Sequence, residues 1–595
     1  MSCTISAETF ILRVLVMNTY KIISEAIKNK LYNIPEIKAL DNPDLLNGIV
    51  VEVPKVRDFG DYATNAAMVL CKALGKNPRE VAGIIMPYIE EIDFVKSVSV
   101  AGPGFININV ADNLWNMLVS DILNNSDTYG NSDIGGGEKV NVEFLSANPT
   151  GPVHIGHARG AILGDVVSRI LKKNGYDVTK EYYVNDYGHQ VDVLGNSIYW
   201  RYQELFGMHA GESLPEGCYP GDYLIPVAES IKNIDGDKWL GATESEYLPY
   251  FKQVGAAAMM DIIRGSLRKI GIEFDVFTSE KSLVDAGKVS GTIEFMKKQD
   301  LLYYGVLPKP LGETEEEWKP EEQLLFKAKQ FGDDVDRVIA RANGVTTYFA
   351  SDIAYHADKF ERGFKKQINV WGADHGGYVK RIKSALGAVT NNQAELDVIL
   401  CQLVSLEKDG KPFKMSKRAG NFVMIEDVLD EIDADVLRLF MVMKSADTQM
   451  TFDLQKAKEQ SKDNPVYYIQ YAYARACSVL KKFNTVFDID VSALADLSFN
   501  MEMASDAEKR LIKVMADYPA IVESAGRTKN PQILTKYLED LAASFHSLWS
   551  TQDGVKLIDE NNLESTKQHM LLVKALKNVI GNGLQTLGAN LKESM

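Results

Sequence analysis

The sequence has few cysteines and no long apolar run. The five cysteines lie far apart and form no Cys-x-x-Cys pair: Cys3, Cys71, Cys218, Cys401 and Cys477. We therefore expect no disulfide framework and no structural metal, and a reducing compartment such as the cytoplasm is indicated. No segment approaches the ~20 apolar residues that a membrane-spanning helix requires, so no membrane partner is expected.

Several nucleotide and metal motifs are also missing. There is no Gly-x4-Gly-Lys-Ser/Thr loop and no His-Glu-x-x-His pair. The nearest glycine pair, Gly102-Pro-Gly104, lacks the third glycine of a dinucleotide fingerprint. These absences argue against P-loop hydrolases, zinc proteases and NAD-type dehydrogenases.

The composition is that of a large acidic globular protein. The 595 residues predict three to five domains. Lys and Arg total 65 against 81 Asp and Glu, which gives a formal net charge of −16. This balance argues against a protein that coats nucleic acid uniformly, but it allows a local basic groove.

Changes in composition divide the chain into segments. Residues 1–16 are interpreted as a dispensable extension, because Met17 is an equally good start. The remaining limits fall at 17–130, 131–405 (with an irregular, acidic insertion at about 195–335), 406–460 and 461–595.

The middle of the chain predicts a βαβ unit. Val140, Val142 and Phe144 alternate as a strand, a helical face follows, and Asn174-Gly175 is a good helix stop before the strand around Tyr182. Parallel strands joined in this way bind ligands at their carboxyl ends. Further strands are predicted near 105–110, 347–350, 368–371 and 398–404, and helices are predicted from about 460 onward.

Two short motifs carry the chemistry. His154-Ile-Gly-His157 follows a strand and opens a helix, whereas Lys414-Met-Ser-Lys417 lies in a loop after a later strand. A helix N-terminus offers unpaired N–H groups to phosphate, and Gly156 permits close approach. The lysines can neutralise charge on a transferring phosphoryl group and its pyrophosphate. The alternative is a purely structural role, in which the two histidines only cap the helix.

With these motifs the chain resembles the class I aminoacyl-tRNA synthetases, and among them the arginyl-tRNA synthetase family. The segments that carry the resemblance are Phe59–Met68, Ala101–Asn107, Val142–Gly160, Tyr183–Gly188, Trp371–Tyr378, Lys414–Asn421, Asp447–Asp453 and Tyr468–Arg475. The resemblance runs through nearly the whole chain from residue 17. It is loosest at 195–335, and Ala434-Asp-Val-Leu-Arg438 stands where the family often has Asp-Ala-Leu-Arg.

The resemblance implies a fold and a reaction. The fold would be α/β: a class I synthetase Rossmann-type catalytic core, an N-terminal α/β tRNA-contacting domain and a C-terminal all-α anticodon-binding bundle. The reaction would join L-arginine to tRNA(Arg) through an arginyl-adenylate, with ATP as substrate, Mg²⁺ travelling with ATP, and a monomeric enzyme. In this family the first step generally requires bound tRNA.

The resemblance also implies roles for individual residues. The catalytic set would be His154, His157, Lys414 and Lys417. ATP would also contact Asn148, Pro149, Gly151, Gly156, Met415 and Ser416. Arginine would be held by Glu143, Ser146, Asn148, Tyr348, Asp352 and His375, since a guanidinium is best read by carboxylates. The tRNA would contact Phe105, Asn107, Tyr471 and Arg475, which suit unstacked bases and backbone phosphates.

Each of these roles has a structural alternative. Asp352 could cap a helix, Glu143 could be a solvent-facing strand residue, and Tyr348 could simply pack in a strand. Phe105 and Asn107 could lie on an ordinary strand face. Tyr471 and Arg475 could serve helix packing alone.

Other functions compete with the synthetase reading as a whole. Three alternatives share parts of the pattern. They are another class I synthetase, a small nucleotidyl transferase with a similar His-Ile-Gly-His motif, such as pantothenate synthetase, and a catalytically inactive tRNA-binding paralogue. Length and the helical tail disfavour the small enzyme, and the intact motifs disfavour the inactive paralogue. The 195–335 segment is too short for an added editing domain, and a buried carboxylate that reads arginine already rejects neutral analogues.

Overall fold

The computed structural model describes residues 18–54, 56, 59–308, 320–408, 411–413, 423–461, 463–549 and 555–595. The predicted extension at 1–16 lies outside these residues. The predicted ATP-site residues Lys414, Met415, Ser416 and Lys417 also lie outside them. No helix among the described residues is long and apolar enough to cross a membrane.

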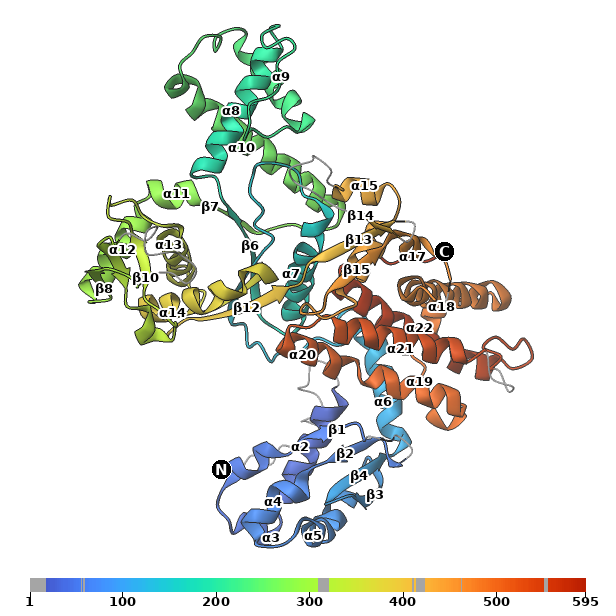
Figure 1. Ribbon diagram of the computed structural model, residues 1–595. Helices are drawn as coiled ribbons and strands as arrows, with labels where there is room; N and C mark the ends of the chain where they lie inside the picture. The colour runs from blue at the N-terminus through green and yellow to red at the C-terminus, as the bar shows by residue number, and fades with distance from the viewer. Residues whose placement is uncertain are drawn as a thin grey trace.

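The N-terminal region packs helices on a small antiparallel sheet (Figure 1, blue). The sheet has the order β1-β2-β4-β3, with β1 Val51–Glu52, β2 Tyr62–Thr64, β4 Phe105–Val110 and β3 Val95–Ala101. The helices are α2 Thr19–Tyr32, α3 Pro35–Lys38, η1 Pro43–Gly48, α4 Ala66–Leu74, α5 Pro78–Glu90 and α6 Asp112–Asn124.

The predicted strand at 105–110 is confirmed as β4, but its polar face is not open throughout. Asn107 is only 6% exposed. The chain at Gly60 crosses over it so closely that a Cβ on Gly60 would lie 3.2 Å from the Asn107 Cβ. The strand is therefore confirmed, but Asn107, a candidate RNA contact, is buried.

A five-stranded parallel sheet forms the centre of the molecule, in the order β12-β11-β5-β6-β7. Its strands are β5 Lys139–Phe144, β6 Asp177–Val184, β7 Val276–Ser279, β11 Lys366–Gly372 and β12 Glu395–Cys401. The predicted βαβ unit is confirmed as β5, α7 (Ile155–Lys173) and β6. The chain builds outward from β5 on one side and then returns to β11 on the other, so the order reverses between β5 and β11. Ligands bind at such a switch point.

The segment at 195–335 is not irregular, as predicted, but largely helical. The helices are α8 His189–Glu204, η3 Asp222–Leu224, α9 Ile225–Asp235, α10 Glu244–Lys269, α11 Glu280–Asp285 and α12 Lys288–Lys298. Helices α8, α9 and part of α10 form a lobe that projects from the core (Figure 1, top). It has its own aromatic core, in which Tyr199 and Tyr247 stack at 3.6 Å. This segment also supplies β7 to the central sheet.

A second small sheet lies beside α12 and α13 Tyr348–Glu361 (Figure 1). It has the order β10-β9-β8, with β8 Leu302–Gly305, β9 Gln323–Phe326 and β10 Arg337–Ala340, and η4 Ala328–Phe331 follows β9. The strand predicted at 347–350 is wrong, because Tyr348 begins helix α13 Tyr348–Glu361. Tertiary packing of Phe349 and Ala350 in this layer overrides their local strand preference.

The strand predicted at 398–404 is two strands. β12 ends at Cys401, and β13 Val404–Lys408 begins a further sheet of order β14-β13-β15. The partners of β13 are β14 Lys411–Phe413 and β15 Met450–Asp453. The remaining helices around these sheets are η5 Ala373–Tyr378, α14 Val379–Thr390, α15 Ile425–Leu429, α16 Ala434–Val442 and α17 Leu454–Lys458.

The predicted helical C-terminal region is confirmed (Figure 1, orange to red). Its helices are α18 Pro465–Phe487, η7 Val491–Leu494, η8 Met501–Met503, α19 Asp506–Ala516, α20 Tyr518–Thr528, α21 Gln532–Ser547 and α22 Leu563–Thr586. The predicted apolar stripe of α21 is fully buried, with Leu534, Leu538, Leu541 and Phe545 at 0% exposure.

One buried ion pair joins the core to the C-terminal helices. Arg438 on α16 donates to Asp165 in the middle of α7 at 2.5 Å and also to the carbonyls of Ile270 and Leu587. Burial raises the pKa of Asp165, but the guanidinium of Arg438 and other cations outweigh it and hold that pKa below its usual value. Gly588 (φ +76°) makes room, since a Cβ there would lie 2.0 Å from the guanidinium.

We predict that Arg438→Met lowers the free energy of unfolding by about 3–5 kcal/mol, because it leaves the Asp165 carboxylate buried without its main partner. Lys592→Met is the control. Lys592 pairs with Asp433 at the surface, and its loss should cost less than about 1 kcal/mol. Urea unfolding followed by circular dichroism measures both. Equal losses in the two variants would contradict this account.

Candidate active site

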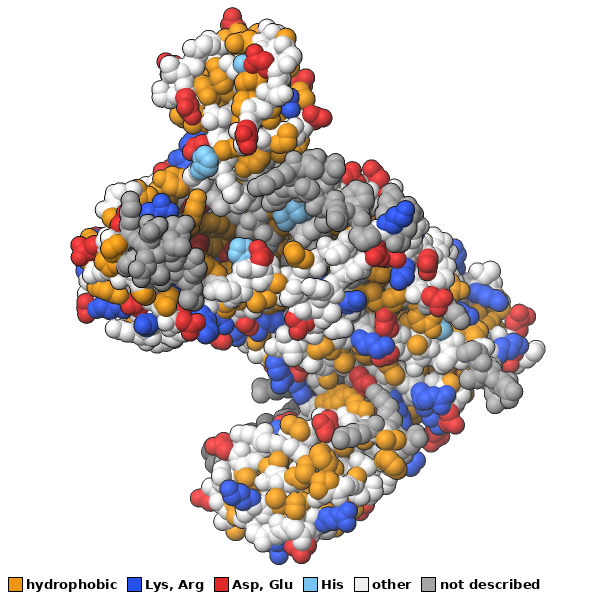
Figure 2. Space-filling view, viewed as in Figure 1, with side chains coloured by type: hydrophobic (Ala, Val, Ile, Leu, Met, Phe, Trp, Pro, Cys, Tyr) orange, Lys and Arg blue, Asp and Glu red, His pale blue; other side chains and the backbone are white. Residues whose placement is uncertain are grey.

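The predicted site residues of the catalytic core gather at the carboxyl edge of the parallel sheet. The loop after β5 leads into α7, and η5 follows β11, so the two loops flank the switch point. On the surface, several histidine side chains lie around the hollow between the projecting lobe and the lobe of α12 to α14 (Figure 2). This is where the sheet topology predicts a ligand.

The first motif forms the N-terminus of α7. His154 occupies the N-cap with extended backbone, and its ring stacks on that of His157 at 3.7 Å. The backbone N–H of His154 donates to Nδ1 of His157 over 3.4 Å. This bond places the proton of a neutral His157 ring on Nε2, where it is a donor. Gly156 lies in the same first turn and adds no side chain above the N–H groups.

The segment that carries the second motif is attached to the first at its far end. His154 and Met424 form an isolated antiparallel bridge. Ile155 N donates to the Val423 carbonyl at 2.9 Å, and Ile425 N donates to the Val153 carbonyl at 3.3 Å. Residues 423–425 follow the predicted lysine motif by six positions in the sequence, and the structure places them beside the histidine motif.

The loop after β5 is sharply bent. Leu145 and Ser146 both have positive φ, at +69° and +41°. For residues with a Cβ this backbone conformation is uncommon, and such conformations cluster at functional sites. The bend lets the Ser146 hydroxyl accept from Tyr183 N at 3.1 Å and donate to Glu143 at 3.3 Å.

Glu143 is a buried strand residue and not a solvent-facing one. Lys359 of α13 donates to it at 2.7 Å, and the lysine is completely buried. Lys359 also reaches Asn369 at 3.4 Å. This buried cation compensates one carboxylate and fixes its position between β5 and β11.

Further acids crowd the same place, and we call Glu143, Asp186, Glu280 and Asp352 the acidic pocket. Burial, followed by the charges of Glu280, Asp352, Glu143 and Asp186, raises the pKa of Tyr183 well above its usual value. Burial also raises the pKa of Glu280, and Asp186 adds to this effect. Several carboxylates therefore face one small volume around the Tyr183 hydroxyl.

Asp352 lies in the second turn of α13, not at the helix N-cap, which is Thr347. Burial raises its pKa to about 7, and the charges of Glu143 and Glu280 add to this effect. A hydrogen bond from the Tyr378 hydroxyl acts in the opposite direction. A carboxyl group balanced between its two forms is well suited to respond to an arriving cation.

The other predicted arginine-site residues lie at the rim. Tyr348 is 67% exposed at the start of α13, and its hydroxyl would lie 3.6 Å from a Cβ on Gly188. It therefore does not pack in a strand. His375 is exposed on η5, 3.6 Å from Asp374. The structure places both residues near the pocket mouth without drawing them into the acidic pocket.

The predicted ATP-site residues before α7 line a second side of the hollow. Asn148 donates to Gln190 at 2.6 Å, and Pro149 is buried. Gly151 lies against the projecting lobe, since a Cβ there would be 2.9 Å from the Tyr223 hydroxyl. The hydroxyl of Tyr223 donates to the Thr150 carbonyl at 2.9 Å and so attaches this loop to the lobe.

In the N-terminal region the candidate RNA contacts are only partly accessible. Phe105 is half-buried and Asn107 is buried. The more exposed aromatic is Phe59, at 63%, next to the Gly60 that covers Asn107. Sequence reasoning placed Phe59 in a motif but gave it no role.

In the C-terminal region Tyr471 and Arg475 belong to one aromatic surface on α18 and α21. Tyr471 is 38% exposed and stacks with Tyr467 at 5.9 Å. The Arg475 guanidinium lies 3.6 Å above the Trp549 ring. An exposed ring beside a cation suits RNA bases, although the same residues also pack the two helices.

Sequence reasoning missed five residues of the acidic pocket and its surroundings. Tyr183, Asp186 and Tyr378 stood within quoted motifs, so the signal was present, but none had been given a role. Lys359 and Glu280 carried no local signal. Their positions follow from helix α13 and strand β7, which were predicted as a strand and as irregular chain.

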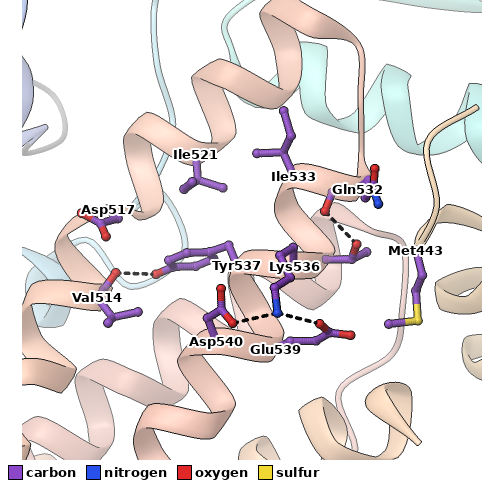
Figure 3. A pocket seen from close by; sticks show the side chains of 11 residues that line it. Met443, Val514, Asp517, Ile521, Gln532, Ile533, Lys536, Tyr537, Glu539 and Asp540 are labelled. Carbon is purple, nitrogen blue, oxygen red and sulfur yellow. Dashed lines mark hydrogen bonds and ion pairs between the residues drawn. The ribbon is translucent and has the colours of Figure 1, made fainter. Parts of the chain in front are cut away.

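A separate cavity of about 770 Å³ lies between α20 and α21 (Figure 3). Lys536 lies between Glu539 and Asp540, at 3.3 and 2.9 Å, and Tyr537 donates to the Val514 carbonyl. No predicted site residue lines this cavity. Lys536 is the cation that lines this cavity, and it is already paired. None of the acidic-pocket residues lines the cavity, so it is a separate feature.

Three features together define a class I aminoacyl-tRNA synthetase. They are the parallel sheet, the histidine motif at the start of α7, and residues 423–425, which pair with that motif. Family models agree along the chain: the arginyl tRNA synthetase N terminal domain at 20–110, the class I (R) catalytic domain at 118–208, the class I (I, L, M and V) synthetases at 343–453 and the DALR anticodon binding domain at 469–595.

Relatives narrow the assignment. Arginine–tRNA ligase of Roseobacter denitrificans is 44% identical over 92% of this chain and 95% of its own. That of Azorhizobium caulinodans is 44% identical over 97% and 100%. The crystal structure of a putative arginyl-tRNA synthetase from Campylobacter jejuni is 32% identical, covers 82% of this chain and 100% of its own, and has a TM-score of 0.70. The chain belongs to the arginyl-tRNA synthetase family.

The raised pKa of Asp352 predicts a pH-dependent affinity for arginine. A guanidinium favours the ionised carboxylate, so binding must release the proton that Asp352 holds below pH about 7. Affinity should rise about tenfold per pH unit up to about 7 and then level off. Calorimetric titration in buffers of different ionisation enthalpy measures the released proton.

Asp352→Asn should weaken binding and remove this pH dependence. Glu361→Gln is the control, because Glu361 lies on the same helix but is exposed and pairs with Lys288. An affinity of the unmodified protein that stays flat from about pH 5.5 to 8 would show that Asp352 does not meet the guanidinium.

Proposed function

We propose that this protein joins L-arginine to tRNA(Arg) in two steps with ATP as substrate. The observation that carries the proposal is the acidic pocket at the carboxyl edge of the sheet, beside the helix N-terminus that bears His154 and His157. A site with several crowded carboxylates selects a cationic side chain, and the adjoining helix N-terminus selects phosphate. The family membership supports the same reaction.

In the first step the arginine carboxylate attacks the α-phosphorus of ATP. A carboxylate–phosphorus bond forms, the bond to the bridging oxygen breaks, and pyrophosphate leaves with Mg²⁺ bound to it as part of the substrate. In the second step a ribose hydroxyl of the terminal tRNA adenosine attacks the arginyl carbonyl. The products are arginyl-tRNA, AMP and a proton.

We assign the acidic pocket to the guanidinium. Asp352 and Glu280 face the cation, while Glu143 is compensated by Lys359 and is fixed by Ser146. Glu143, Ser146 and Asn148 then lie on the side of the pocket nearer α7, where the α-amino and carboxylate groups of arginine belong. Tyr348 and His375 close the mouth.

ATP is assigned to the hollow over the N-terminus of α7. His154 and His157 donate to its phosphates, and Asn148, Pro149, Gly151 and Gly156 shape the loop beneath it. Lys414, Met415, Ser416 and Lys417 are assigned to the same nucleotide because they precede, in the chain, Met424, which pairs with His154. The lysines stabilise charge on the pyrophosphate in the transition state.

For RNA we assign the N-terminal domain, through Phe105, Asn107 and Phe59, and the aromatic surface of Tyr471 and Arg475. The enzyme would act as a monomer in the cytoplasm. Because the body carries a net charge of −16, tRNA binding must depend on local cations and should weaken steeply with salt.

Charging assays test the reaction and its specificity. With total tRNA, ATP and each of the twenty amino acids, only arginine should be charged. Asp352→Ala should lower kcat/KM for arginine by at least about 100-fold, because a buried charge partner of the substrate is lost. Glu361→Gln should charge at the unmodified rate. Charging of another amino acid, or of none by the folded protein, would overturn the proposal.

Pyrophosphate exchange separates an enzyme from an inactive tRNA-binding paralogue. His154→Ala and His157→Ala should each reduce exchange by about 100-fold, since donors to the developing phosphate charge are worth that much in kcat. Binding of tRNA in a filter assay should be unchanged. Exchange that is absent in the unmodified protein, with tRNA binding intact, would favour the paralogue.

A further inference from the structure

Arg159 is the largest charged side chain buried near the histidine motif, and neither the arginine pocket nor the ATP assignment uses it. It lies on α7, two residues after His157, and is 1% exposed. The ion pairs among the described residues do not include it. A buried guanidinium without an ion-pair partner needs other groups to satisfy its donors.

Backbone carbonyls take that role. The guanidinium donates to the carbonyls of Thr448 at 2.8 Å and Ser445 at 2.8 Å, to Gln402 at 3.1 Å and to Lys444 at 3.5 Å. We call these four groups the carbonyl cradle. A planar fork with five N–H donors can serve several acceptors at once, which a lysine cannot do.

The cradle lies at the start of the sheet that precedes the lysine motif in the chain. Gln402 lies between the end of β12 at Cys401 and the start of β13 at Val404, and β13 pairs with β14, which ends one residue before Lys414. Thr448 precedes β15, the other partner of β13. Gln402 N also donates to the Ala446 carbonyl at 2.9 Å. Arg159 therefore holds the start of the sheet formed by β13, β14 and β15.

The far end of the same segment is attached to the same helix. Residues 423–425 pair with residues 153–155 at the start of α7. Both ends of the stretch from 402 to 425 are thus fixed to α7, one through Arg159 and one through the backbone of the histidine motif.

We propose that Arg159 is a positioning residue for adenylate formation: by fixing the start of β13 it sets the place of the β13–β14 hairpin, which ends one residue before Lys414, relative to the histidine motif. It touches no reacting atom and acts through this hairpin. This inference rests on the proposed function. The cradle also contains Lys444 and Ser445, and the residue before them, Met443, lines the cavity between α20 and α21 (Figure 3). The carbonyl cradle therefore also adjoins the C-terminal helical domain.

The first test is the kinetics of Arg159→Lys in pyrophosphate exchange with tRNA present. Displacing a transition-state group by about 1 Å costs on the order of 100-fold, so kcat should fall by about that factor while KM for arginine stays within about twofold. Rates are normalised to the active sites titrated by adenylate formation, which removes any loss from unfolded protein. A kcat within twofold of the unmodified enzyme, or a loss confined to KM for arginine, would overturn the proposal.

A double-mutant cycle shows whether Arg159 acts through the lysine motif. Adding Arg159→Lys to Lys417→Ala should cause little further loss of kcat, because the positioned group is already absent. Arg438→Lys is the matched control: it is an equally buried arginine that donates to carbonyls and packs on α7. The fold losses of kcat caused by Arg438→Lys and by Lys417→Ala should multiply in the double variant. Losses that multiply for Arg159→Lys as well would assign it a purely structural role.

Hydrogen exchange gives a readout that does not depend on activity. Arg159→Lys should speed amide exchange in β13 and β14, whereas Arg438→Lys should speed it near Leu587 and leave β13 unchanged. If Arg159→Lys fails to fold, Arg159→Gln carries the same test, because its neutral amide NH2 can still donate to carbonyls of the cradle. If the unmodified protein charges no amino acid, the proposed function fails, while unchanged exchange in β13 would separately overturn the role of Arg159.

Discussion

The crowding of buried and half-buried carboxyl groups around Tyr183 is the constraint on which the proposed site depends. The acids come from four places that meet only in the folded chain: β5, the end of β6, the start of α11 and the second turn of α13. Lys359 relieves the repulsion at Glu143, but the pKa values of Glu280 and Asp352 remain raised. Under the proposed function, the guanidinium of arginine would relieve what remains by pairing with these carboxyl groups.

The catalytic groups are brought together by a different principle. Phosphoryl transfer needs donors whose positions are fixed before the reaction. Helix α7 provides that reference, because His154 and His157 begin it, Arg159 holds the start of β13, and residues 423–425 pair with its first residues. Further along the same helix Asp165 accepts from Arg438, which also donates to the Leu587 carbonyl at the end of α22. One helix thus connects the histidine motif, the start of β13 and the C-terminal helices.

Sequence reasoning succeeded where the information was local. The alternation at 140–144, the helix stop at Asn174-Gly175 and the histidine motif at a helix start are all found as predicted. It failed where partners are distant in sequence. Tyr348 to Ala350 have strand-forming character, yet packing against the layer of β8 to β10 makes them helical. Because that error hid the face of α13, Lys359 went unnoticed, although Asp352 had been named from the family pattern.

The two ends of the chain show how binding domains can be held apart from the chemistry and still be coupled to it. The N-terminal domain contacts the helical domain through Lys21 with Glu523 at 2.7 Å and Lys513 with Asp61 at 2.5 Å. The Tyr20 hydroxyl adds a bond to Asp517 at 2.5 Å. Such contacts are weak individually. Beneath them, however, α6 packs on α22 within one continuous hydrophobic core, and Asn582 of α22 donates to the carbonyls of Ser126 and Tyr129. Buried packing, more than the surface ion pairs, therefore couples the N-terminal domain to the helical domain and, through Arg438 and Asp165, to α7.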